Sequence, residues 1–409
     1  MTRGLAPGSP RAGAEGAGRI FTVPFVSLMV ANGLLRICTF MLIALVPLYV
    51  VQRGFSTTVA GLTTTCYMLA AVLVRPLSGR LVDTRGRYIV MVLGALLYMV
   101  ATGLYVPTLP VWALLAVRAL QGLGFSFNGT AVTTLATDLI PEGRMAEGLG
   151  YLGIEQTVAQ LFAPWFALTL LGAFGYRVAF SVVFALGVLN LLVRFPLRKI
   201  AVRLDRERRA AERARDETGA GPWWSRIVDE HAWRPSLIMF FLMFGGAAVN
   251  TFMAVHAIGH GIANAGLYYT ASAVAVAVAR LLVGRIERRF GAVWIIAPGI
   301  TLIAAGLLGI AWSPGLPVLM AAGACYGLGF GSVQPGLNSM AVLSAARESR
   351  GLANSTFFMA MDLSQAIGAV ALGALASAAG TGSVFVGAAA MAVLTFVLYF
   401  VLRARGFLS

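Results

Sequence analysis

Long, uninterrupted apolar runs dominate this chain of 409 residues and limit what it can fold into. Hydrophobic residues make up 59% of the sequence and charged residues only 11%, whereas soluble domains carry about 25% charged residues. A soluble fold would have to expose much of this apolar surface to water. Runs of about 20 apolar residues are long enough to cross a bilayer as helices, so the composition predicts an integral membrane protein. The runs are continuous rather than alternating, which disfavours a transmembrane β-barrel.

Twelve such runs lie along the chain, and we interpret each as a helix because hydrocarbon offers no partner to an unpaired backbone group. They lie at 21–51, 58–77, 88–106, 111–139, 146–174, 178–193, 235–255, 263–283, 292–312, 317–343, 352–378 and 384–402. The predicted fold class is therefore an all-α integral membrane protein with twelve transmembrane helices.

Three segments fall outside these runs. Residues 1–20 are rich in glycine, alanine and proline and lack the short apolar core of a signal peptide, so we predict a disordered tail. Residues 194–234 mix arginine with aspartate and glutamate, which predicts a solvated or headgroup-lying linker, with binding of a regulator as the alternative. Residues 403–409 form a second short tail.

Arginines are strongly biased to one side of the predicted membrane. The tails, the linker and the loops after the even-numbered runs hold nearly all of them, whereas the opposite loops hold only Arg53 and Arg177. Because positively charged loops stay in the cytoplasm, we predict a multi-pass protein of the plasma or inner membrane with both termini cytoplasmic. The net charge of +15 then reflects topology, and no nucleic-acid partner is predicted.

Several kinds of site find no support in the sequence. Lys199 is the only lysine and lies between Arg198 and Ile200, so the chain has no P-loop. Its three cysteines are far apart within apolar runs and are interpreted as core residues. His256 and His260 share a helical spacing, but no further ligands accompany them. We therefore predict no metal, no cofactor and no enzymatic activity.

A repeat with a nearly constant offset runs through the sequence. Residues 75–86 match residues 280–291, and the Gly-Leu-Gly-Phe segment at 122–125 recurs at 327–330, both at an offset of 205. The carboxylates inside runs 5 and 11, Glu155 and Asp362, lie 207 residues apart. Several matches in the same order indicate an internal duplication rather than chance.

The duplication predicts two pseudo-symmetric six-helix halves. The first half covers residues 21–193, the linker covers 194–234, and the second half covers 235–402. Parallel repeats of this kind place a substrate site between the halves near the middle of the membrane.

Two motifs carry a resemblance to a known family. Residues 79–87, Gly-Arg-Leu-Val-Asp-Thr-Arg-Gly-Arg, resemble the signature of the major facilitator superfamily between its second and third spans. Residues 118–124, Arg-Ala-Leu-Gln-Gly-Leu-Gly, resemble its span 4 motif, which is associated with proton-coupled members. The resemblance covers the chain from the first run to the twelfth. It implies the fold of that family and transport by rocking of the two halves.

The resemblance also implies a conformational latch in the loop between runs 2 and 3, with an echo in the second half. The residues to which we assign this role are Gly79, Asp83, Gly86, Arg87, Gly284, Arg285 and Gly291. Glycines there permit tight turns and close helix approach, and Asp83 is expected to accept hydrogen bonds from helix ends and to pair with Arg87 or a neighbouring helix.

Ionisable side chains inside the runs are the candidates for proton coupling. Arg36, Arg118, Glu155 and Asp362 fall within hydrocarbon depth, where each must face protein or a watery cavity. We predict that they form ion pairs and that a carboxylate among them changes protonation during transport. Four polar residues are expected to line the substrate cavity or to join helices. They are Tyr67, Asn128, Gln156 and Asn250.

The favoured function is secondary active transport with alternating access, namely proton-antiport efflux of a small organic or amphipathic molecule by a monomer in the bilayer. The alternatives are proton-coupled uptake of a small organic solute and, less favoured, a membrane sensor or scaffold that does not transport. A few cavity side chains determine the substrate, so the sequence does not name it.

Overall fold

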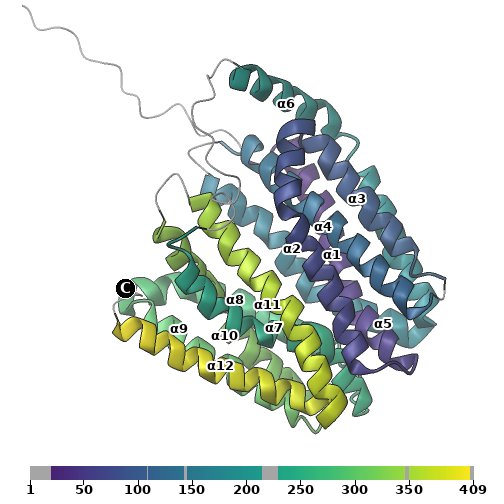
Figure 1. Ribbon diagram of the computed structural model, residues 1–409, viewed down its shortest axis with the longest axis vertical. Coiled ribbons are helices and arrows are strands. Elements are labelled where there is room, and N and C mark those ends of the chain that lie inside the picture. The colour runs from purple at the N-terminus through teal and green to yellow at the C-terminus, as the bar shows by residue number, and fades with distance from the viewer. Residues whose placement is uncertain (1–19, 108, 142–144, 214–228, 346–349, 406–409) are drawn as a thin grey trace, which may run out of the picture.

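The computed structural model describes residues 20–107, 109–141, 145–213, 229–345 and 350–405 (Figure 1). The described chain forms helices and turns only. The helices are α1 (Val23–Gln52), α2 (Thr57–Arg85), α3 (Arg87–Gly103), α4 (Val111–Leu139), α5 (Met145–Leu192), α6 (Leu197–Arg213), α7 (Trp233–Gly259), α8 (Leu267–Phe290), α9 (Val293–Ala311), α10 (Leu316–Leu343), α11 (Arg350–Ala379) and α12 (Thr381–Ala404). Most of the predicted tail at 1–20 and part of the one at 403–409 lie outside the described residues.

The helices confirm the predicted twelve-span fold class once α5 is divided. Within the described residues, nine helices are long and apolar enough to cross a membrane. The segment α5 consists of two helices that meet at Gly175, whose backbone is not helical and whose φ of +76° is a conformation that glycine adopts readily. It therefore contains two of the predicted runs. Counting α5 twice and adding α3 and α4 gives twelve spans.

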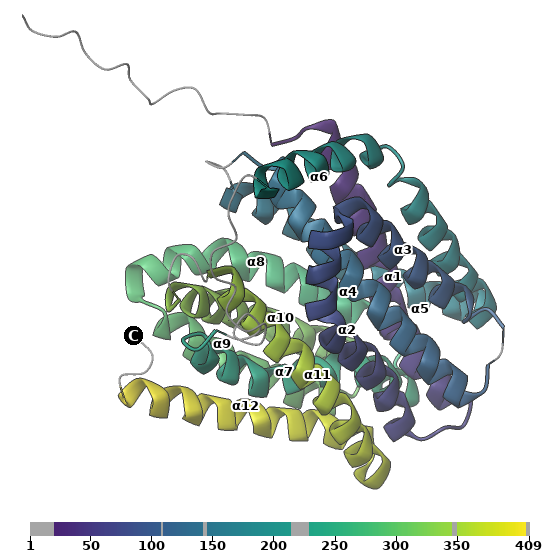
Figure 2. The same ribbon diagram turned by 45° about the horizontal axis from the view of Figure 1, so that its top comes forward.

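Helix α6 lies outside the two bundles and belongs to the predicted linker. Its residues Leu197 and Ala201 are buried against a cluster of the first half that includes Phe25 and Val82. Arg198 and Lys199 are exposed, so the helix is amphipathic. In Figures 1 and 2 it lies across the end of the first half where α1 begins. We call the side where α1 begins and α12 ends the terminal face, and the other side the opposite face.

The internal repeat is visible in close helix contacts at equivalent positions. A Cβ atom on Gly124 of α4 would lie 2.7 Å from the Gly94 carbonyl oxygen of α3. One on Gly329 of α10 would lie 2.4 Å from the Gly299 carbonyl oxygen of α9. Both pairs differ by 205 residues, the offset found in the sequence. Small residues allow backbones to approach this closely, so each half is tightly packed inside.

Contacts between the two halves involve α2 with α11 and α5 with α8 (Figures 1 and 2). Near the opposite face, Thr58 and Ser377 join α2 to α11 with hydroxyl oxygens 2.9 Å apart, and the Thr65 hydroxyl donates to the Ala366 carbonyl. At the second contact between the halves, the Thr270 hydroxyl of α8 donates to the Leu161 carbonyl of α5. The halves are therefore held together mainly toward the opposite face.

We predict that Gly124→Ala lowers the stability of the protein. The added methyl group would clash with the backbone of α3, and overpacking of this kind costs about 1–3 kcal/mol. Gly129→Ala is the matched control on the same helix, because nothing lies within 4 Å of a Cβ atom there. Thermal unfolding of the purified protein in detergent measures both. Equal melting temperatures for the two variants would contradict the close packing of α3 and α4.

Candidate functional site

Glu155 belongs to a chain of polar contacts inside the first half. The Asn32 amide of α1 donates a hydrogen bond to one Glu155 carboxylate oxygen of α5, and the Asn128 amide of α4 donates to the Asn32 carbonyl oxygen over 3.1 Å. The other Glu155 oxygen is buried and accepts no hydrogen bond from the described residues. Three helices thus meet at one carboxylate that keeps acceptor capacity. The sequence identified Glu155 and Asn128 but missed Asn32, a polar residue four positions before Arg36 in the first run.

Arg118 is almost fully buried, at 1% exposure, and is held by neutral groups. Its Nε donates to the Thr63 carbonyl of α2 at 3.2 Å, and one Nη donates to the Gln121 side chain at 2.9 Å. Its guanidinium carbon lies 4.9 Å from the centre of the buried Tyr67 ring. We predicted a carboxylate partner, but none of the described carboxylates pairs with it. Gln121, which the prediction did not include, takes that place.

Arg36 of α1 lies near the same aromatic residues. Its guanidinium carbon is 5.2 Å from the centre of the Phe125 ring, and its buried Nε has no hydrogen-bond partner in the described chain. The Phe125 ring in turn lies 5.5 Å from the Tyr67 ring. Arg36, Phe125, Tyr67 and Arg118 therefore form a series of contacts that we call the arginine–aromatic stack.

Asp362 of α11 forms an ion pair across the two halves, with Arg75 of α2. Both side chains are largely buried, at 15% exposure for Asp362 and 29% for Arg75. The prediction identified Asp362 as ionisable but did not name this partner. A signal was present, because Arg75 opens the segment that is repeated in the second half.

The pseudo-symmetric counterpart of this pair is a neutral hydrogen bond. Arg280, which follows Arg75 by 205 residues, donates to the Thr157 hydroxyl at 3.0 Å and so joins α8 to α5. Thr157 precedes Asp362 by the same 205 residues. The two interfaces therefore use the same positions, but only one of them holds an ion pair.

The remaining polar candidates divide between the halves. Asn250 of α7 donates to the Gln365 side chain of α11 at 2.8 Å, a contact within the second half. Gln156 of α5 is exposed. His256 contacts the Thr381 hydroxyl at 2.8 Å and the Ile310 carbonyl at 3.1 Å, so this imidazole joins α7 to α12 and α9. The described residues contain no group of three or more His, Cys, Asp or Glu side chains placed to hold a metal ion.

The predicted latch loop begins a polar cluster on the terminal face. Gly86 ends α2 with a φ of +99°, and Arg87 opens α3. The Asp205 carboxylate of α6 accepts from the Arg87 backbone N–H at 3.1 Å and from its side chain at 2.9 Å. Arg87 also pairs with Asp138 at the end of α4, at 2.9 Å. The linker helix thus caps α3, a contact that the sequence did not reveal.

The other latch candidates contribute less to this cluster. Gly79 has open space where a side chain would lie, and Gly291 separates α8 from α9 with a φ of +88°. Gly284 is half-buried within α8 and Arg285 is exposed. The Asp83 side chain lies outside the described part of the structure, so its role stays a prediction.

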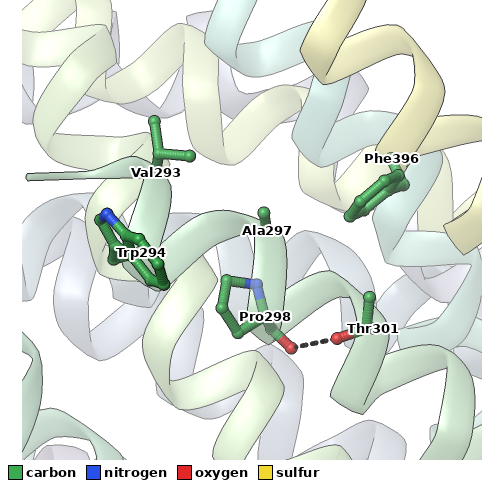
Figure 3. Close-up of a pocket in the computed structure, with 6 residues that line it drawn as sticks. All are labelled: Val293, Trp294, Ala297, Pro298, Thr301 and Phe396. Atoms are coloured by element: carbon green, nitrogen blue, oxygen red, sulfur yellow. Dashed lines mark hydrogen bonds between the residues drawn. The ribbon is translucent and has the colours of Figure 1, made fainter.

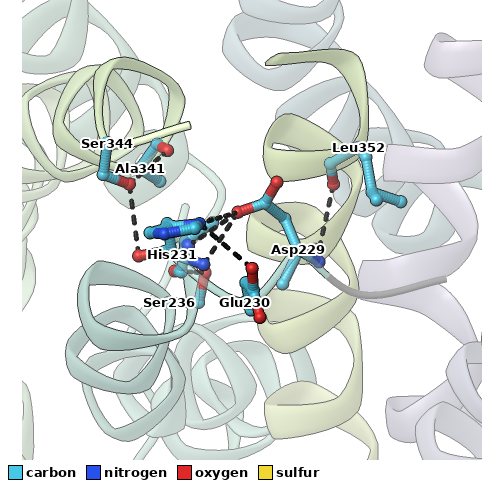
Figure 4. Close-up of polar contacts among 9 residues, drawn as sticks. Asp229, Glu230, His231, Ser236, Ala341, Ser344 and Leu352 are labelled. Carbon is cyan, nitrogen blue, oxygen red and sulfur yellow. Dashed lines mark hydrogen bonds and ion pairs between the residues drawn. The ribbon is translucent and has the colours of Figure 1, made fainter. Parts of the chain in front are cut away.

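The far end of the linker is fixed to the second half (Figure 4). The Asp229 carboxylate accepts from the backbone N–H groups of His231 and Ala232 at 2.9 and 3.1 Å, just before α7. The Asp229 backbone N–H donates to the Thr356 hydroxyl of α11 at 2.8 Å. The Ser344 hydroxyl, after α10, donates to the His231 carbonyl. Each described end of the linker is therefore attached to its own half.

A groove of about 370 Å³ lies between α9 and α12 (Figure 3). It is lined by Val293, Trp294, Ala297, Pro298, Thr301 and Phe396. The lining is almost wholly apolar and has no ionisable side chain. Because α9 and α12 do not form the described interface between the halves, the groove is separate from the polar contacts above.

We predict that Asp205→Ala destabilises the first half. The change leaves the buried Arg87 with one carboxylate partner and removes the cap of α3, and loss of a cap alone costs about 0.5–2 kcal/mol. The melting temperature in detergent should fall clearly, whereas Arg206→Ala, an exposed change on the same helix, should leave it unchanged. An unchanged melting temperature for Asp205→Ala would mean that the contact is not stabilising.

Comparison with known proteins accounts for this architecture. The family model described as Major Facilitator Superfamily matches residues 28–263 and, again, 236–406. The uncharacterized MFS-type transporter YhhS of Escherichia coli (strain K12) is 27% identical over 383 residues, which cover 89% of this chain and 88% of that protein. The staphylopine export protein of Staphylococcus aureus (strain Mu50 / ATCC 700699) is 22% identical over 276 residues, or 63% of this chain and 64% of the relative.

Solved structures agree on the fold. The nucleoside transporter NupG has a TM-score of 0.75 at 15% identity, with 93% of this chain and 99% of that chain covered. A bacterial homolog of the human lysosomal transporter Spinster, in an inward-facing and occupied conformation, has a TM-score of 0.74 at 15% identity, covering 93% and 96%. With a repeated match that spans residues 28–406, the chain belongs to the major facilitator superfamily of membrane transporters.

Proposed function

We propose that this transporter is a proton-coupled antiporter that exports a small organic molecule from the cytoplasm. Family membership makes it a multi-pass membrane transporter rather than an enzyme. The single observation that carries the proton-coupling proposal is the Arg75–Asp362 ion pair, because it is a titratable contact between the two halves that must move during transport.

The first part of the proposal concerns orientation and state. The arginine bias supports a cytoplasmic terminal face. Described polar contacts between the halves extend from the opposite face to Arg75–Asp362 and Arg280–Thr157, and none is found beyond them toward the terminal face. Figures 1 and 2 show α2 and α11 converging toward the opposite face. This arrangement supports a conformation that is open to the cytoplasm.

The second part concerns coupling. Separation of α2 from α11 would leave Arg75 and Asp362 unpaired at membrane depth, where an unpaired charge is expensive. A proton on Asp362 removes one of the two charges and so lowers this cost. Proton binding therefore favours the conformation in which the pair is apart, which is the differential affinity that coupling requires. Glu155 is the second candidate proton site, since its free oxygen is buried and its neighbour Asn32 links it to α1 and α4.

The third part concerns the latch. Arg87, Asp138 and Asp205 form a charged cluster at the loop that carries Gly79, Asp83 and Gly86. In the opposite conformation the terminal ends of the halves would close against each other, and this loop lies at that closing surface. We assign the cluster to stabilising the closed terminal face, with Asp83 as a further member.

The direction of transport rests on a relative. The staphylopine export protein, which matches 63% of this chain, supports export. Proton-coupled uptake is the competing direction, and the assay below separates the two.

The proposal predicts that Asp362→Asn abolishes gradient-driven transport while energy-independent exchange of substrate survives. Without the carboxylate, Arg75 loses its partner in every conformation, and proton binding no longer distinguishes the conformations. Glu155→Gln tests the second proton site in the same way. Glu230→Gln is the control, because that carboxylate is 89% exposed on the terminal face.

Inside-out membrane vesicles with an acidified interior provide the measurement. A pH-sensitive dye reports proton release when compounds of a chemically diverse panel are added, and accumulation of the active compound inside the vesicles reports export. Proton release by the wild type that persists in Asp362→Asn and Glu155→Gln would reassign both carboxylates to structure. Accumulation only in right-side-out vesicles would establish uptake.

A further inference from the structure

We infer that the substrate is an organic anion with a flat apolar part, bound at the arginine–aromatic stack of the first half. The inference rests on the proposed function and deepens it, because it names the chemical class that the transporter carries. It begins from two guanidinium groups at membrane depth, Arg36 and Arg118, that no described carboxylate neutralises.

The nearby carboxylates already have other partners. Glu155 accepts from Asn32, and Asp362 is paired with Arg75. Arg36 lies within electrostatic range of both carboxylates but within ion-pair distance of neither. The buried Arg194 also lies within electrostatic range of Glu155, so four guanidinium groups, those of Arg36, Arg75, Arg118 and Arg194, share two carboxylates. The region keeps an excess positive charge, and the excess grows when a carboxylate takes up a proton.

The guanidinium group of arginine keeps its positive charge in proteins, so these side chains do not relieve the excess themselves. An arginine at membrane depth therefore needs a partner that lowers the cost of its charge. The aromatic faces of Phe125 and Tyr67 provide part of this stabilisation. They leave the Arg36 Nε and one Arg118 Nη buried without a hydrogen-bond acceptor among the described residues. A carboxylate, sulfonate or phosphate group on a ligand is the chemistry that fits donors of this kind.

The fold itself does not require these arginines. The second half has Gly323 at the position equivalent to Arg118, and there the space is taken by Tyr268, 2.9 Å from a Cβ atom on that glycine. Residues 235–255 of α7, the helix corresponding to α1, contain no charged side chain. These arginines are costly in hydrocarbon, and the equivalent half of the protein lacks them. Their presence therefore indicates ligand binding rather than packing.

The aromatic members of the stack indicate the rest of the ligand. Phe125 and Tyr67 place two rings beside the arginines, 5.5 Å apart and tilted by 50°. A flat apolar group could pack against the Phe125 ring, which is partly exposed, while its acidic group meets Arg36, which is also only partly buried. Tyr67, at 1% exposure, contacts Phe125 and completes the stack from within the protein. An aromatic carboxylate is the simplest molecule with both features.

Equilibrium binding to the purified full-length protein tests the inference with three probes of one shape. The probes are 2-naphthoate, its neutral amide 2-naphthamide, and the cation 2-naphthylmethylammonium, each titrated by calorimetry. The wild type should bind the carboxylate at least tenfold more tightly than the amide, because hydrogen bonds to charged groups are the stronger ones. The cation should show no binding.

Variants locate the effect at the stack. Arg36→Gln should remove the preference for the carboxylate and leave the affinity for the amide within about twofold, whereas Arg36→Lys should keep part of the preference. Arg177→Gln, an exposed arginine near the opposite face, should behave as the wild type. The wild-type comparison alone remains decisive if Arg36→Gln does not fold.

Two results would overturn the inference. The first is that the wild type binds the carboxylate no more tightly than the amide, or does not bind it at all. The second is that Arg36→Gln keeps the wild-type preference for the carboxylate. Neither result would touch the proposed function, which depends on proton release with any compound and on Glu155 and Asp362. Conversely, loss of proton coupling with the carboxylate preference intact would reject the coupling mechanism and keep the substrate class.

Discussion

Arg75 and Asp362 form an ion pair between α2 and α11, and in our account the movement of the two halves against each other depends on this pair. At membrane depth the separated charges have a much higher free energy than the ion pair, because no water solvates them there. The equivalent positions on the other side, Arg280 and Thr157, form a hydrogen bond with no second charge. Of these two equivalent contacts, only the one between α2 and α11 therefore contains a carboxylate, although the sequence duplication places equivalent residues in both. This asymmetry is the physical basis on which we propose proton coupling.

Tight packing within each half supports movement of the two halves as rigid bodies. Glycines bring α3 against α4 and α9 against α10 so closely that a methyl group would clash with backbone at Gly124 and Gly329. The described ends of the linker are each attached to one half only. Asp205 attaches α6 to the first half, and Asp229 attaches the segment before α7 to the second half. Relative movement of the halves thus need not disturb the packing inside either of them.

Much of this architecture could be predicted from the sequence, since apolar run length and a constant offset do not depend on tertiary detail. Partners were harder to predict. Arg118, Glu155 and Asp362 were recognisable as charges within apolar runs. The contacts of Glu155 with Asn32 and of Asp362 with Arg75 depend on how each helix is rotated against helices far away in the chain. Gln121 lies three residues after Arg118 on the same helix, so helical spacing could have indicated that contact. The Asp205 contact was hidden for the same reason, because a charge-mixed linker reads as solvated until it is placed beside Gly86 and Arg87.

Cross-linking across the opposite face tests the central claim, that transport requires the halves to separate there. With Cys38, Cys66 and Cys325 replaced by alanine, cysteines at Thr58 and Ser377, whose hydroxyl oxygens lie 2.9 Å apart, would join α2 to α11. Cysteines at Ser78 and Ser126, 3.2 Å apart within the first half, provide the control. We expect oxidation to stop transport in the first protein, reduction to restore it, and the control to transport in both states. Undiminished transport by the protein cross-linked between Thr58 and Ser377 would contradict the account.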